Sequence, residues 1–147
     1  MTNETSTTEK ESKLARRELA QEDFNRFMEM WDIDTDRDFM DADTVKNFDE
    51  IERQVIREIM RGRFIVRDDD AVFKLKEGSF DNLSEVTLTA PRFGALVKTD
   101  QHKAGQDIKK MNELISALTG QPPATIAKLT FADGMFLQAC ANLFFSR

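Results

Sequence analysis

Four aspartates alternate along the segment DIDTDRDFMDAD, a spacing at which carboxylate oxygens can bind a calcium ion. Two positions depart from a calcium loop. Arg37 stands where such loops carry Gly, and the twelfth residue is Asp43 where a longer, bidentate Glu is expected. We therefore expect an acidic linker over 32–43, with Asp43 or Thr44 capping the next helix, and keep a calcium-binding regulatory module as an alternative. The ligands in that alternative would be Asp32, Asp34, Asp36, Asp38 and Asp43.

Residues suited to covalent catalysis are few in this chain. A Ser or Cys nucleophile needs a base nearby, and the single histidine, His102, lies in the polar segment VKTDQHKAGQD. The single cysteine, Cys140, has no polar sequence neighbour that would lower its pKa, so we expect a core thiol. There is also no glycine-rich phosphate loop and no zinc-ligand spacing. The sequence therefore predicts a protein that is not an enzyme and has no cofactor.

Charge and composition also limit the classes of partner. The chain has 147 residues and a formal net charge of −6, so its overall field opposes binding to nucleic acid or to an anionic membrane. We find neither a signal peptide nor an apolar run long enough to span a bilayer. A lone cysteine suits a reducing compartment. These features predict a cytoplasmic protein without nucleic-acid or membrane partners.

The N-terminal part divides into a tail and two helices. Residues 1–12 carry no apolar anchor after Met1, which predicts a disordered, mobile tail. Residues 13–62 are expected to form a helical extension, with one helix on each side of the acidic linker 32–43. The first helix has an aromatic-rich stripe that either docks on the core or binds a partner, and the second has a clear apolar face. The stripe consists of Phe24, Phe27, Met28 and Trp31, and the face of Val45, Phe48, Ile51, Val55, Ile56 and Ile59.

A small antiparallel sheet is predicted to follow. The segment RFIVRDDDAVFKLK reads as a hairpin around the turn Asp68-Asp69-Asp70, whose adjacent carboxylates should stay in solvent. The second strand can pair again with the alternating residues around Val86 and Leu88. The strands are expected at about 63–67, 71–76 and 83–89. With helices on one face, residues 63–147 would form an α+β domain with a C-terminal helical bundle.

Glycine and proline divide the C-terminal segment into helices. Pro91 can open a helix through Phe93, Leu96 and Val97. A second helix should place Ile108, Met111, Leu114, Ile115 and Leu118 on its buried face and end at Gly120. Pro122-Pro123 and a short turn follow, and Thr130 can cap the last helix, with Asp133 at the positive end of its dipole.

The last helix carries no charge from Gly134 to Ser146 and is apolar around most of its circumference. A surface helix keeps a polar face, so this helix must either be covered nearly all round or offer apolar area to a partner.

The order of these elements resembles a known family. The segment LISALTGQPPATIAKLTFAD, from Leu114 to Asp133, is similar to the tail assembly chaperones of Mu-like and P2-like contractile-tailed bacteriophages. Its pattern is a helix, Thr-Gly, Pro, a short apolar turn, Leu, and Asp at the start of the next helix. The resemblance covers about residues 72–147, roughly the C-terminal half.

The resemblance implies a non-enzymatic protein that acts in viral tail assembly in the host cell cytoplasm. Such a chaperone would bind the apolar helical tape-measure protein, keep it soluble until the tail-tube protein polymerises around it, and have the tail-tube protein as a further partner. The alternative is a structural or oligomerising tail component retained in the virion, a homo-oligomer whose apolar helix is buried between subunits. The residues expected to contact the partner are Met111, Ile115, Met135, Phe136, Leu143, Phe144 and Phe145.

Overall fold

The protein is described by a computed structural model over residues 2–76, 83–92 and 107–145. Helices precede and follow a three-stranded antiparallel sheet, which confirms the predicted α+β class. The predicted helix after Pro91, with Phe93, Leu96 and Val97, lies outside the described residues. In chain order the elements are α1 (Thr2–Met30), the 3-10 helix η1 (Arg37–Phe39), α2 (Ala42–Met60), β1 (Phe64–Val66), β2 (Ala71–Lys74), β3 (Glu85–Leu88), α4 (Asp107–Thr119), α5 (Pro123–Ile126) and α6 (Phe131–Phe145).

The sheet has the strand order β1-β2-β3 and lies within the predicted strand limits. Phe64 pairs with Phe73, and Phe73 pairs in turn with Val86, so these three buried side chains form a row across one face of the sheet. In the β1–β2 turn Asp68 and Asp69 are exposed, as expected from their mutual repulsion. The predicted hairpin and its third strand are therefore confirmed.

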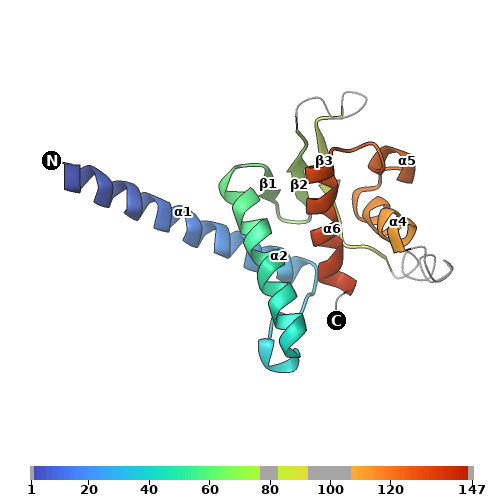
Figure 1. The fold of residues 1–147 in the computed structure, drawn as a ribbon, viewed down its shortest axis with the longest axis horizontal. Helices are drawn as coiled ribbons and strands as arrows, with labels where there is room; N and C mark the ends of the chain where they lie inside the picture. The colour runs from blue at the N-terminus through green and yellow to red at the C-terminus, as the bar shows by residue number, and fades with distance from the viewer. Residues whose placement is uncertain (1, 77–82, 93–106, 146–147) are drawn as a thin grey trace.

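Helix α6 lies at the centre of the molecule, between α2 and α4 (Figure 1). The Phe136 ring stacks on the Phe73 ring with the ring centroids 4.2 Å apart. It also packs against the Phe64 ring in a T-shaped arrangement, with the centroids 5.4 Å apart. Leu137 and Cys140, on the same helix, are fully buried. Because helices and sheet surround it, α6 needs no continuous polar face, which explains its uncharged sequence.

Helix α1 is a long arm whose C-terminal end enters the core. Phe24, Phe27 and Met28 are buried, and the Phe27 ring lies 5.2 Å from that of Phe64, so the aromatic stripe docks on the core. From residue 9 to residue 19 every side chain is exposed, and the arm projects from the body (Figure 1).

The start of α1 differs from the sequence prediction. Residues 2–12 belong to this helix, whereas the sequence predicted a disordered tail for 1–12. The prediction considered only tertiary anchoring, but Glu and Lys are good helix formers, and Glu9 and Lys13 stand in the favourable i, i+4 order.

Candidate functional site

The acidic linker uses its carboxylates to cap backbone groups. Asp34 Oδ1 accepts a hydrogen bond from the Asp36 N–H at 2.9 Å, and Asp36 Oδ1 accepts one from the Asp38 N–H at 3.0 Å. Arg37 points to α2, where its Nη2 forms ion pairs with Asp49 Oδ1 at 2.7 Å and with Glu52 Oε2 at 2.8 Å. Across the described ranges, no group of three or more His, Cys, Asp or Glu is arranged to hold a metal ion, and the candidate calcium ligands are not brought together.

Helix α2 is capped by Asp41. Its Oδ1 accepts a hydrogen bond from the Thr44 N–H at 2.7 Å, and this bond lowers the pKa of Asp41 because it stabilises the charged carboxylate. The prediction that Asp43 or Thr44 caps this helix is wrong. Either residue would have started the helix later than Ala42, where it begins.

The residues considered for catalysis are not assembled into a reactive site in the described part of the chain. Cys140 is fully buried, and this burial raises the pKa of its thiol well above the usual range. His102 lies outside the described residues. With a protonated, enclosed thiol, a nucleophilic role for Cys140 has no structural support.

An open apolar groove of about 490 Å³ lies between α4, α5 and α6. Three of its side chains are large hydrophobic groups left in solvent: Ile108 is 88% exposed, Phe131 84% and Met135 45%. Isolated exposed hydrophobes are common on proteins, but several around one concave surface mark a binding site. The other apolar lining residues are Met111, Ile115, Ile126, Ala127 and Leu129.

The predicted contact residues separate into three sets. Met111, Ile115 and Met135 line the groove, and Ile115 is at the same time buried as part of the core. Phe136 and Leu143 are buried in the core and are not available to a partner. The correction follows from α6 being apolar around most of its circumference, so that its sequence alone does not show which side faces the sheet. The side chains of Phe144 and Phe145 lie outside the described residues.

Sequence reasoning also missed two groove residues. Ile108 was assigned to the buried face of its helix, but it stands in the first turn of α4 and is mostly exposed. Phe131 is the first residue of α6, directly after the Thr130 cap. A large aromatic residue directly after a predicted helix cap was the available signal.

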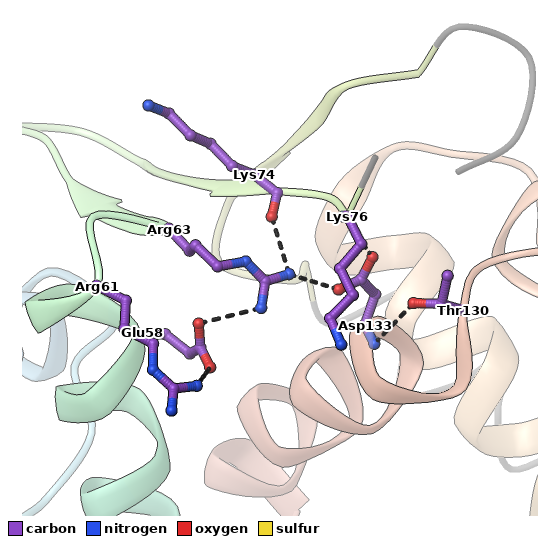
Figure 2. A network of polar contacts seen from close by, with 7 residues as sticks. All are labelled: Glu58, Arg61, Arg63, Lys74, Lys76, Thr130 and Asp133. Carbon is purple, nitrogen blue, oxygen red and sulfur yellow. Dashed lines mark hydrogen bonds and ion pairs between the residues drawn. The ribbon is translucent and has the colours of Figure 1, made fainter. Parts of the chain in front are cut away.

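A buried ion pair fixes the end of α6 that forms the groove (Figure 2). Asp133 is completely buried, and its Oδ1 lies 2.6 Å from Arg63 Nη2, while Oδ2 accepts a hydrogen bond from the Lys76 N–H at 2.9 Å. Thr130 Oγ1 accepts a hydrogen bond from the Asp133 N–H at 3.3 Å, which confirms the predicted cap. A buried carboxylate needs such partners because burying an unpaired charge is costly.

Arg63 extends this network to α2 and the sheet. Its Nη1 lies 3.2 Å from Glu58 Oε2, and its Nη2 donates to the Lys74 carbonyl at 3.2 Å (Figure 2). Its guanidinium also lies 4.9 Å from the centre of the Phe73 ring. One side chain therefore connects the end of α2, strand β2 and the start of α6, and holds the groove wall relative to the body.

A second, polar cleft of about 340 Å³ continues from the groove. Met135 and Gln138 line both, and the cleft runs on between α6 and α2 past Asn142, Asn47 and Gln54. The combined surface offers apolar contacts at one end and side-chain amides at the other. Such a surface suits an amphipathic segment better than a small molecule.

Comparison of the chain with protein-family models, with curated proteins and with solved structures finds no match. Within the described ranges, no helix is both long and apolar enough to cross a bilayer.

Proposed function

We propose that this protein is a non-enzymatic phage tail assembly chaperone, which binds apolar helical segments of the tape-measure protein in the host cytoplasm. The observation that carries the proposal is the clustering of Ile108, Phe131 and Met135 around one groove. The segment that resembles the chaperone family, Leu114 to Asp133, supplies the end of α4, all of α5 and the start of α6. The resemblance and the groove thus fall on the same part of the chain.

The proposed mechanism is reversible shielding. An amphipathic helix can lay its apolar face into the groove, with side chains at i, i+3 and i+4 contacting Phe131 and Met135. Met suits this role because its flexible thioether adapts to different partners. Because only a few side chains of the groove contact the bound tape-measure helix, that helix can be released when the tail-tube protein assembles around it. The net charge of −6 keeps the loaded chaperone dispersed.

The experiment is co-expression with the tape-measure protein of the same phage. We expect the wild-type chain to keep the tape-measure protein in the soluble fraction and a Phe131→Ser, Met135→Ser variant to lose this effect. Removing one such contact should weaken binding by about tenfold to a hundredfold, because a buried large apolar side chain contributes about 1.5–3 kcal/mol. Circular dichroism and thermal melting should stay unchanged, since both side chains are exposed.

Leu19→Ser provides the matched control. Leu19 is also a large exposed hydrophobe, but it lies on α1 and not in the groove. The proposal fails if the groove variant still keeps the tape-measure protein soluble, or if Leu19→Ser abolishes solubility equally. Mass spectrometry of purified virions adds a second test, because a chaperone should be absent and a retained tail component present in stoichiometric amount.

A further inference from the structure

A second groove, of about 690 Å³, lies between the projecting part of α1 and the C-terminal half of α2. Its apolar surface is formed by Leu14, Ile56 and Met60, of which Leu14 is more than half exposed. No acidic side chain lines it among the residues that the structure describes. Its remaining lining residues are all cationic, namely Lys10, Lys13, Arg17, Arg53, Arg57 and Arg61. We call this surface the basic groove.

These cations are largely without counter-charges from their own chain. Within the described part of the chain, the side chains of Lys13, Arg17 and Arg57 make no ion pair, and Arg61 has one long contact, 3.3 Å from Glu58. Like charges on neighbouring helix positions repel each other. A cluster of six cations in a protein of net charge −6 therefore favours an acidic occupant with an apolar centre.

The acidic linker has the complementary character. Phe39 is 83% exposed, and the aspartates on both sides of it are exposed as well. Arg37, the only cation of the linker, is neutralised by Asp49 and Glu52 of α2. We call this surface the acidic knob: Phe39 with Asp34, Asp36, Asp38, Asp41 and Asp43.

The knob and the basic groove of one chain cannot meet. The knob lies at the N-terminal end of α2 and includes Asp43 of its first turn, whereas the groove is lined by the other half of that helix, from Arg53 to Arg61 (Figure 1). From Ala42 to Arg53, the first α2 residue of the groove, the helix rises about 16 Å at 1.5 Å per residue. The knob can therefore fill only the groove of another molecule.

We propose that the acidic knob of one copy of this chain docks into the basic groove of a second copy. Phe39 contacts the apolar surface around Leu14 and Met60, and the aspartates pair with the surrounding Lys and Arg. The contact is heterologous, so in a docked pair one copy still has a free groove and the other a free knob, and assembly continues into a ring or a filament. The proposal is independent of the apolar groove between α4, α5 and α6.

The first test is sedimentation velocity of the purified full-length chain. We expect species heavier than the 16.9 kDa monomer, whose fraction grows with protein concentration. Raising sodium chloride from about 0.1 M to about 1 M shortens the Debye length from about 10 Å to about 3 Å and should return the protein to monomer. A chain that stays monomeric at low salt and high concentration overturns the proposal, as does assembly that is unaffected by salt.

Two variants test the two surfaces separately. The groove variant, Arg53→Glu with Arg57→Glu, reverses charges on an exposed helix face, where Glu is as good a helix former as Arg. The knob variant, Asp38→Lys with Phe39→Ser, changes two exposed side chains that cap no helix. Each variant alone should be monomeric with an unchanged melting temperature.

Mixing the variants gives the decisive result. The groove variant keeps a normal knob and the knob variant keeps a normal groove, so the mixture should form a one-to-one pair and nothing larger. Asp69→Lys, at the exposed tip of the β1–β2 turn, is the control and should assemble like the wild type. A mixture that stays monomeric overturns the proposal. Binding of heparin by an otherwise monomeric chain assigns the basic groove to a polyanion and also overturns it.

Discussion

The arm of α1 and helix α6 differ in the forces that maintain them. Residues 9–19 of the arm are all exposed and none belongs to the hydrophobic core, although Leu14 lies beside Ile56 and Met60 of α2 in the basic groove. Helix α6 carries a single acidic residue, Asp133, and packs against α2, α4 and the sheet. The arm depends on local hydrogen bonds and helix propensity, while α6 depends on burial and one ion pair. The comparison shows that two helical segments without a one-sided apolar stripe, residues 9–19 of α1 and helix α6, can be stable for opposite reasons.

Phe136→Ala should give the largest effect on the α6 side of this comparison. The variant loses the ring contacts with Phe64 and Phe73 and should lower the free energy of unfolding by about 3–5 kcal/mol, measured by urea denaturation. Phe131→Ala is the matched control, with an expected change within about 0.5 kcal/mol because its ring is exposed. Equal losses in the two variants would contradict the central position of α6.

Asp133→Asn should have the next largest effect. The change leaves Arg63 without its buried counter-charge and should cost about 3 kcal/mol in the same denaturation assay. Asp69→Asn, an exposed carboxylate in the β1–β2 turn, is the control and should change stability by less than about 0.5 kcal/mol. If Asp133→Asn were neutral, the network in Figure 2 would not be what fixes α6.

Ala15→Gly in the arm should give the smallest effect on the body. Glycine costs an exposed helix about 1 kcal/mol per position, so far-ultraviolet circular dichroism should lose some helical signal. The melting temperature of the body should not change, because Ala15 contributes nothing to the core. Ala20→Gly, at a buried position on the same helix, should lower it. An arm that melts together with the body would show that the two regions are coupled.

The sequence predicted those parts of the fold that periodicity and turn residues determine. The alternation around Val86, the stripe of α2 and the Thr130 cap were read correctly, since each depends on neighbours within a few residues. The ion pair between Arg63 and Asp133 joins residues far apart in the chain, and no local pattern indicates it. Sequence reasoning therefore placed Asp133 at the helix start but gave it no partner.

The candidate groove was only partly predictable for a related reason. Phe131 and Phe136 have the same side chain and lie on the same helix, yet one is exposed in the groove and the other is in the core. Hydrophobicity cannot separate them when the helix is apolar around most of its circumference. The distinction comes from where the sheet and α4 lie around α6, and this is tertiary information.

The fully buried Cys140 gives the molecule a built-in reporter. A thiol reagent reaches its sulfur only when α6 leaves the body, so the rate of labelling under native conditions measures how often that opening occurs. As the chain has one cysteine, the labelling signal reports on α6 alone. The stability of the packing of α6 against the body can therefore be followed without denaturant, and the arm, which has no cysteine, does not react with the reagent.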